Sequence, residues 1–166
     1  YDDNEQCHVG DCDAMEVENL RYMMKDCDVI YCAISGRYLP IVADNIVSAM
    51  KETGVRRLIF MGAVGIYDEI PLNMDDEDNV RNNPEQVPNR EAVDIVENSE
   101  LDYTILRPGY LQDGDKEDFT LTFKGEQAKG YISTISSVVE LAVRLIDDDM
   151  LYVCQSISIT KNMSDK

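Results

Sequence analysis

Four short apolar runs in this chain are each followed by small or polar residues, a combination that lets a backbone approach a bound ligand closely. The residues that follow the runs are Gly10 and Asp11, Ser35 and Gly36, Gly62 and Ala63, and Pro108 and Gly109. If the runs are parallel strands, their carboxyl ends meet at one edge of a sheet, which is where open α/β sheets bind nucleotides. Ordinary turn chemistry is the alternative interpretation of each pair taken alone.

The segment Leu101–Leu111 contains the clearest of these strand ends. The preceding residues 89–100 have the apolar spacing of a helix, and residues 102–106 form a β-branched and aromatic run that is typical of a strand. A strand-exit turn without a ligand is the alternative interpretation. The residues that follow the strand are candidates for lining a nucleotide site: Arg107, Pro108, Gly109, Tyr110 and Leu111.

Strand-forming runs recur along the chain and supply the sheet that such a site requires. Residues 28–34 and 57–61 are almost continuously apolar, which is typical of strands that are buried on both faces of a parallel sheet. Residues 6–9, 119–123 and 153–159 are shorter strand candidates.

Helical patterns lie between these strands. The apolar spacing predicts helices over residues 14–25, over residues 39–53 and from residue 137 onwards. The expected start and stop signals are Asp13 with Glu16 and Ser137 with Glu140, which match a capping box, and Gly54, which ends the second helix. The polar segment 67–88 contains no comparable pattern, and loops of that length are usually functional lids or mobile segments.

The alternation of strands and helices predicts an α/β fold, with a mostly parallel sheet and helices on both faces. The chain of 166 residues is long enough for one domain with its own core, so we expect a single domain over residues 1–166.

The charge balance excludes some classes of function. The formal net charge is -18, so a polyanion would be repelled and nucleic acid is not an expected partner. The acidic run 75–78 is interpreted as a solvated loop, and we expect no metal site there or beside His8, which has no second cluster of ligands at zinc-site spacing.

The five cysteines include no C-x-x-C pair, and their odd number favours a reducing compartment over a disulfide framework. Cys27 and Cys32 flank a strand pattern and are expected in the core. No apolar run reaches the ~20 residues that a membrane span needs, so we expect a cytoplasmic protein without a membrane partner.

In order and spacing, these motifs resemble the atypical short-chain dehydrogenase/reductases, specifically the NmrA-like NAD(P)-binding group. The matching segments are VGDCD at 9–13, CAISG at 32–36, RLIFMGAVGIYDE at 57–69, SELDYTILRPGYL at 99–111 and the segment 123–133. The resemblance implies a Rossmann-like fold that binds NAD or NADP. The residues it places at the cofactor are Asp11, Cys12, Ala33, Ile34, Ser35, Gly36, Gly62, Ala63, Arg107, Pro108, Gly109 and Tyr110.

The family's opening β-α-β unit, with its glycine-rich turn, has no counterpart in this sequence. That unit supplies the central strand and the helix end that cradles the pyrophosphate, so a chain without it should bind dinucleotide poorly. We therefore expect roughly 35 to 50 further residues before Tyr1 in the intact protein. The choice between NAD and NADP is left open, because the residue that reads the ribose follows the absent second strand.

Catalytic members of the wider superfamily use a Tyr-x-x-x-Lys pair as proton donor. The corresponding positions here are Glu85 and Asn89, which cannot perform that role. Tyr67, just beyond the 57–61 strand, is the candidate catalytic residue, and packing within the loop is the alternative role for its side chain.

The resemblance implies an NAD(P)-binding protein of the reductase type. Hydride transfer requires only that cofactor and acceptor are held close and aligned, so a quinone, flavin or other small acceptor could be reduced with a proton from solvent. A dinucleotide-binding redox sensor without catalysis, which acts on a regulatory partner protein, is the alternative. A module that binds nothing until completed by an amino-terminal segment is a third possibility. The oligomeric state is left open.

Overall fold

The computed structural model describes residues 7, 9–74, 76–115 and 119–161. Its centre is a five-stranded sheet with the order β1-β2-β3-β7-β5, in which every neighbouring pair is parallel except β5 with β7. The strands are β1 (Val29–Cys32), β2 (Arg57–Met61), β3 (Asp102–Pro108), β5 (Thr120–Phe123) and β7 (Gln155–Thr160). The predicted mostly parallel α/β architecture is confirmed.

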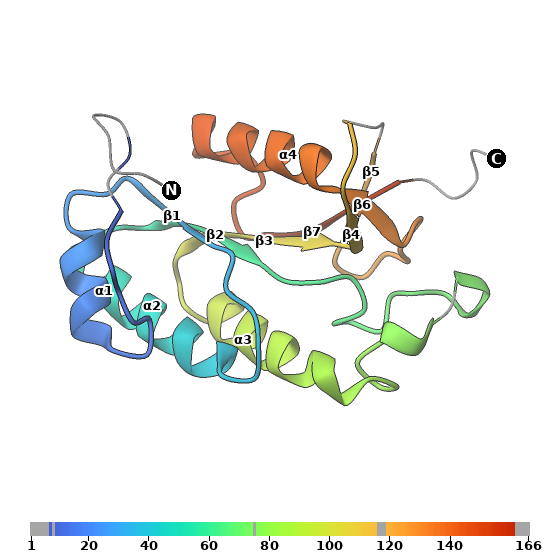
Figure 1. Cartoon of the computed structure of the whole chain (residues 1–166), viewed down its shortest axis with the longest axis horizontal. Coiled ribbons are helices and arrows are strands. Elements are labelled where there is room, and N and C mark those ends of the chain that lie inside the picture. Colours follow the sequence, from blue (N-terminus) through green and yellow to red (C-terminus); the bar gives the residue numbers. More distant parts are fainter. Residues whose placement is uncertain (1–6, 8, 75, 116–118, 162–166) are drawn as a thin grey trace.

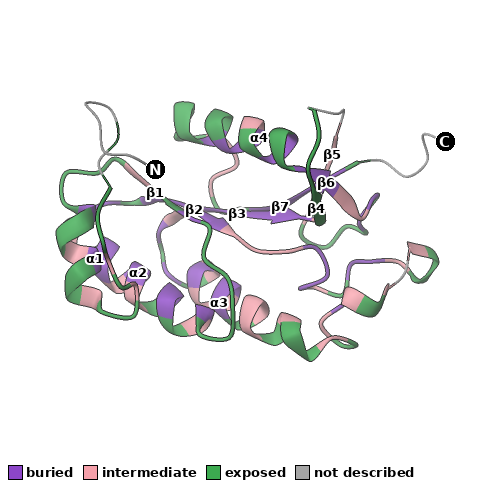
Figure 2. Ribbon diagram, viewed as in Figure 1, coloured by how far each residue is buried: buried purple, intermediate pink, exposed green. Residues whose placement is uncertain are grey.

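Helices cover both faces of the sheet (Figure 1). Alternating residues of β2 face opposite layers, since Leu58 and Phe60 belong to one apolar core and Ile59 to the other. Figure 2 shows that burial concentrates in the sheet and on the helix surfaces that face it. One layer contains α1 (Val17–Met24), α2 (Leu39–Thr53) and α3 (Val87–Glu97), and the other contains α4 (Ile135–Asp147).

The predicted element boundaries agree best with the structure where the sequence contains a strong local signal. The predicted helix 39–53 and strand 57–61 match α2 and β2 at both ends, and Gly54 closes α2 in the left-handed conformation at φ 81°. At α3 the start lies at Val87 instead of 89, because Pro88 occupies the first turn, where its missing N–H is tolerated. Conversely, β1 is shorter than the predicted run 28–34, and β3 is longer than 102–106.

Both predicted capping boxes are wrong. The Asp13 carboxylate accepts a hydrogen bond from the Met15 backbone N–H and forms a turn, so α1 begins only after Glu16, whose side chain makes no cap. In α4 the N-cap is Thr134, which accepts from the Ser137 N–H. The S-x-x-E pattern at Ser137 therefore placed the start of this helix about one turn after its true N-cap.

At the amino terminus, the strand expected over 6–9 falls in part on residues 6 and 8, which lie outside the described residues. Of the others, Cys7 forms an isolated bridge and Val9 has no regular structure. Cys32 is buried as predicted, whereas Cys27 is exposed, so its predicted place in the core is wrong.

A second, two-stranded parallel sheet was not predicted. It pairs β4 (Tyr110–Gln112) with β6 (Ile132–Thr134) beside the carboxyl end of β3. Close approach at Gly109 makes this pairing possible, because a Cβ on that residue would lie 2.5 Å from the carbonyl carbon of Tyr131. The sheet thereby folds the segment before α4 over the end of β3.

In the described part of the segment 67–88 there are three short 3-10 turns, η1 (Leu72–Met74), η2 (Asp76–Asp78) and η3 (Pro84–Gln86), and α3 begins at its end; the remaining described residues are loop as predicted. The fully buried side chain of Asn79 holds this segment in place. Its amide donates to the Ile70 carbonyl at 2.8 Å and accepts from the Ile70 N–H at 3.0 Å. This anchor fixes the position of the neighbouring Asp78.

No helix in the described part of the chain is both long and apolar enough to span a membrane. The described residues also contain no group of three or more His, Cys, Asp or Glu side chains placed to hold a metal ion.

Candidate cofactor and substrate site

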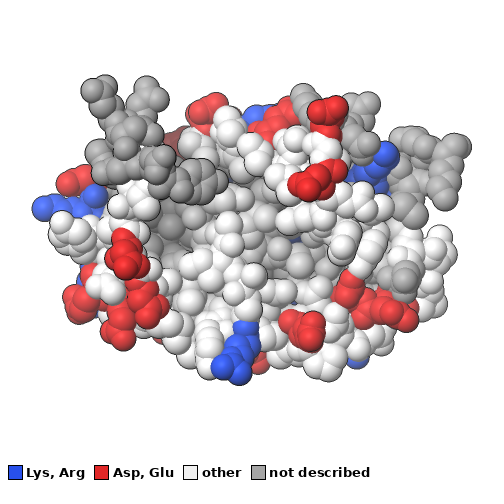
Figure 3. Space-filling model, in the orientation of Figure 1, with Lys and Arg blue, Asp and Glu red and all other residues white. Residues whose placement is uncertain are grey.

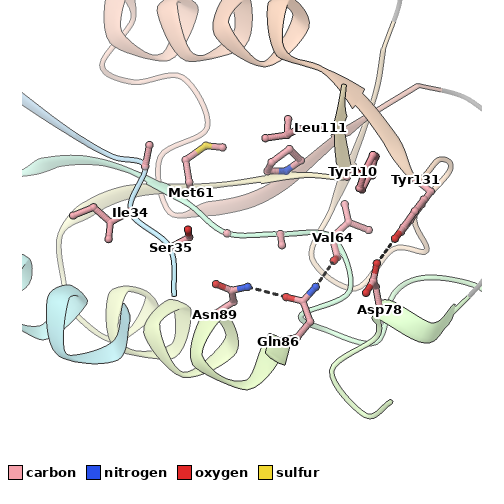
Figure 4. A pocket seen from close by; sticks show the side chains of 15 residues that line it. Ile34, Ser35, Met61, Val64, Asp78, Gln86, Asn89, Tyr110, Leu111 and Tyr131 are labelled. Carbon is pink, nitrogen blue, oxygen red and sulfur yellow. Dashed lines mark hydrogen bonds between the residues drawn. The ribbon is translucent and has the colours of Figure 1, made fainter. Parts of the chain in front are cut away.

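The carboxyl ends of β1, β2 and β3 border a cavity of about 560 Å³, within the usual size of small-molecule sites. Figure 4 shows its lining side chains, with Ile34 and Ser35 on one side and Asp78 and Tyr131 on the other. The lining residues are Ala33, Ile34, Ser35, Met61, Gly62, Ala63, Val64, Asp78, Gln86, Asn89, Pro108, Gly109, Tyr110, Leu111 and Tyr131.

Small residues keep this edge of the sheet hollow. The backbone beyond β2 continues alongside β3, since the Gly62 N–H donates to the Leu106 carbonyl and the Val64 N–H to the Pro108 carbonyl, both at 2.9 Å. A Cβ on Gly62 would come within 3.2 Å of Ile105, so even alanine is tight there. The strand ends thus form an apolar floor whose shape is set by backbone.

Eight of the twelve residues predicted to bind cofactor lie together on this cavity: Ala33, Ile34, Ser35, Gly62, Ala63, Pro108, Gly109 and Tyr110. Leu111, proposed from the strand end, lies there too. Asp11, Cys12 and Gly36 do not line it, and neither do Arg107 and Tyr67. The geometry therefore brings together the strand ends of β1, β2 and β3 but not the segment around Asp11.

Arg107 is in the core instead of the cavity wall. Its side chain is fully buried, forms an ion pair with Glu69 and donates from Nε to Ser156 Oγ at 3.0 Å. Burial lowers the pKa of the Arg107 guanidinium. Alternation along β3 explains this placement, because Arg107 points to the face opposite Leu106. The role we predicted for Arg107 at a cofactor has no geometric support.

Tyr67 belongs to the same polar network as Arg107, because both side chains form hydrogen bonds with Ser156 Oγ. Its phenol donates to Glu97 Oε1 at 2.7 Å and lies 3.1 Å from Ser156 Oγ. The ring faces the cationic groups of Arg90 at 4.6 Å and Arg107 at 5.0 Å. Burial raises the pKa of Tyr67. A phenol that holds its proton this firmly, and lies away from the cavity, is poorly placed to be a proton donor there.

The Tyr67 environment predicts an alkaline effect on stability. Above its ordinary pKa of 10.0 the phenol ionises in the unfolded chain but stays protonated in the folded one, so the free energy of unfolding falls as pH rises. Tyr67→Phe should make that fall shallower between about pH 9.5 and 11, measured by urea unfolding. Tyr22→Phe is the control, since Tyr22 is 81% exposed. Equal slopes in Tyr67→Phe and wild type would contradict the prediction.

Six cavity residues were not predicted: Met61, Val64, Asp78, Gln86, Asn89 and Tyr131. Met61 and Val64 flank the predicted Gly62 and Ala63 and could have been found from them. Asn89, at the position aligned with the superfamily lysine, lines the cavity. Its side-chain amide donates to Gln86 Oε1 at 2.8 Å. Asp78 is half-buried on the cavity wall, so the interpretation of the acidic run as a wholly solvated loop is wrong there.

A parallel sheet whose small-residue strand ends border a cavity defines a Rossmann-like, nucleotide-binding class of protein. A family model described as NAD(P)H-binding matches residues 1–149. The chain therefore belongs to the NAD(P)H-binding family, and the resemblance drawn from its motifs is confirmed.

Solved structures agree with this assignment. A Rossmann-fold NAD(P)-binding family protein from Shigella flexneri is 33% identical, with 90% of this chain and 68% of that one covered at a TM-score of 0.76. A short-chain dehydrogenase/reductase from Veillonella parvula in complex with NADP is 21% identical, with 99% and 76% covered at 0.85. An anaerobilin reductase from Escherichia coli O157:H7 is 17% identical, with 89% and 72% covered at 0.75.

A comparison with curated proteins found no match. The likenesses at 21% and 17% identity show the fold alone, so the reaction and its substrate must be argued from the cavity.

Proposed function

We propose that this protein is an NAD(P)H-dependent reductase of a small acceptor such as a quinone or a flavin. The observation that carries the proposal is the cavity at the ends of β1, β2 and β3, which is large enough for a flat ring and has a floor of backbone and small residues. Membership of the NAD(P)H-binding family supports the cofactor.

The lining residues fit the nicotinamide end of such a cofactor. Met61, Pro108 and Leu111 offer apolar surface for a flat ring, and the side-chain amides of Gln86 and Asn89 offer hydrogen-bond partners of the kind that a carboxamide needs. Among the described residues that line the cavity there is no lysine or arginine.

Bound NAD(P)H supplies a hydride, which carries two electrons, to an acceptor held next to it. The chain's own contribution is to orient the two rings between the small-residue floor and Tyr110, and to exclude part of the bulk water. Tyr110 is 63% exposed, so this mouth of the cavity stays open and a reduced acceptor can take its proton from solvent. An acceptor that needs no protein acid is consistent with Glu85 and Asn89 in place of a Tyr-x-x-x-Lys pair.

A redox sensor is the second candidate, and the same absence of a Tyr-x-x-x-Lys pair favours it. In that case the cavity binds dinucleotide without turnover, and occupancy changes the affinity for a regulatory partner protein. The cofactor site is the same in both candidates.

Calorimetric titration with NADH and NADPH, followed by a spectroscopic assay of NAD(P)H oxidation with quinones, flavins and aldehydes, separates the candidates. Binding with oxidation of NAD(P)H is the expected result. Binding without oxidation by any acceptor would favour the sensor, and no binding of either dinucleotide would contradict both.

A blocking variant localises the site. Ala33 is exposed at the cavity, so Ala33→Trp should fold and should weaken dinucleotide binding by at least about tenfold through loss of space. Met150→Trp is the matched control, because Met150 is 75% exposed and borders a separate pocket with the amino-terminal residues of β1 and β2. Equal binding by both variants would place the dinucleotide elsewhere.

A further inference from the structure

The wall opposite Ile34 and Ser35 contains the one carboxylate among the described residues that line the cavity, that of Asp78. Both of its oxygens are held: Oδ1 accepts from Asn83 Nδ2 at 2.9 Å, and Oδ2 accepts from the Tyr131 hydroxyl. Figure 4 shows the pair of Asp78 and Tyr131 facing each other across this end of the cavity.

The backbone holds this carboxylate in place. A Cβ on Gly65, whose φ is 101°, would collide with the Asp78 carbonyl oxygen, so the two segments are in direct backbone contact. The next residue, Asn79, is fully buried and bonded to both backbone groups of Ile70. Asp78 therefore cannot swing out of the wall without disturbing buried groups.

Among the residues that the structure describes, no cation neutralises the charge on Asp78. In the described ranges Asp78 forms no ion pair, and the nearby Arg81 is paired with Asp76 at 2.6 Å. Figure 3 shows a middle of this face largely without charged side chains, with acidic and basic groups at its borders. The formal net charge of the whole chain, -18, adds to the negative potential.

A carboxylate offers about four lone-pair positions, and the two hydrogen bonds to Asp78 use two of them. The remaining positions can accept from an N–H or O–H group of a ligand in the cavity. An anionic group at the same place would meet an uncompensated like charge in a partly desolvated space, where repulsion is stronger than in bulk water.

We propose that Asp78 is a specificity-determining residue that makes the cavity select uncharged or cationic acceptors with a hydrogen-bond donor, and reject anionic ones. The proposal rests on the reductase function above. It narrows the substrate class, since acceptors that carry a carboxylate, sulfonate or phosphate near the reacting ring are excluded.

The test compares two probes that differ in charge: a naphthoquinone carboxamide, which is uncharged and has N–H donors, and a naphthoquinone sulfonate built on the same ring. Equilibrium binding of each is measured by calorimetry in the presence of saturating NADP⁺, and kcat/KM for each is measured with NADPH. Wild type should bind the uncharged probe at least about tenfold more tightly than the sulfonate.

Asp78→Asn removes the charge with little change of shape. The sulfonate should then bind about tenfold more tightly, while the affinity for the uncharged probe changes less than about threefold. Glu77→Gln is the matched control, because it changes the net charge equally at an exposed neighbouring residue that does not line the cavity. Equal affinities of wild type for the two probes, or the same selectivity in Asp78→Asn as in wild type, would overturn the proposal.

A salt titration of wild type gives a test that needs no variant. Raising the salt from about 0.05 to 0.5 M should strengthen sulfonate binding and leave the uncharged probe nearly unaffected, since screening weakens repulsion. Binding is read without turnover, so selective binding without NADPH oxidation would contradict the reductase while the charge selection stands. Oxidation of NADPH with both probes at equal kcat/KM would support the reductase and contradict the charge selection.

Discussion

Replacing Gly109 by alanine is expected to lower the free energy of unfolding by about 2 to 3 kcal/mol and to weaken dinucleotide binding. The added Cβ would collide with the Tyr131 carbonyl, which also accepts the Tyr110 N–H at 2.6 Å. A backbone cannot rotate out of the way as a side chain does, so β4 and β6 must separate. Because Gly109, Tyr110 and Tyr131 all line the cavity, its shape changes with them.

Gly62→Ala is the control for this effect. Gly62 also lines the cavity, but its Cβ would meet side-chain atoms only, with Ile105 Cγ2 at 3.2 Å and Ile66 Cδ1 at 3.4 Å, and side chains can shift more easily than backbone. Its cost should stay below about 1.5 kcal/mol. Urea unfolding measures both variants, and a Gly109→Ala cost no larger than that of Gly62→Ala would contradict the close backbone contact.

The second large effect is expected at the buried ion pair of Arg107 with Glu69. Both side chains are almost completely buried, at 0% and 5% exposed. Glu69→Ala should therefore cost about 3 to 5 kcal/mol, because it leaves the Arg107 guanidinium without its counter-charge in the core. Loss of the Tyr67 N–H to Glu69 Oε2 bond, at 2.9 Å, adds to the destabilisation.

A double variant separates two effects of Glu69→Ala: the unpaired charge that it leaves on Arg107 and the packing that it removes. Arg107→Met combined with Glu69→Leu removes both charges, and it should be at least about 1 kcal/mol more stable than Glu69→Ala. The exposed pair of Arg56 with Asp102 is the comparison, and Arg56→Met should lower the free energy of unfolding much less than Glu69→Ala does. Urea unfolding gives all three values. A double variant less stable than Glu69→Ala would show that the pair stabilises the fold beyond mutual neutralisation.

The sequence predicted the elements whose signals are local. The apolar stripe of α2, its closing Gly54 and the continuous run of β2 depend on neighbouring residues only, so their bounds were correct. The pairing of β4 with β6 depends on Gly109 meeting Tyr131, 22 residues away in sequence, and three-residue strands have no periodicity to recognise. The capping boxes failed because Asp13 and Thr134 offered better local hydrogen bonds.

The candidate site divides in the same way. Strand-end residues such as Ser35, Gly62 and Pro108 were found because a parallel sheet brings its carboxyl ends together. Asp78 ends the 3-10 turn η2 and Tyr131 lies in a loop, and contacts between residues far apart in the sequence, such as the backbone contact at Gly65 and the hydrogen bond between the two side chains, bring them to the cavity. Arg107 was misplaced because its neighbours on the strand end do line the cavity, whereas its buried partner Glu69 is 38 residues away.

The pairing of β3 with β7 aligns Thr104 with Gln155, so the last strand joins the middle of the sheet across a long stretch of chain. Such non-local contacts carry a large loop-closure entropy before they contribute stability, and they slow folding. We therefore expect β1, β2 and β3 to assemble first from neighbouring β-α-β units and β7 to dock late. Ser156 arrives with β7, so the hydrogen bonds that Arg107 and Tyr67 make to it form only in the final folding step.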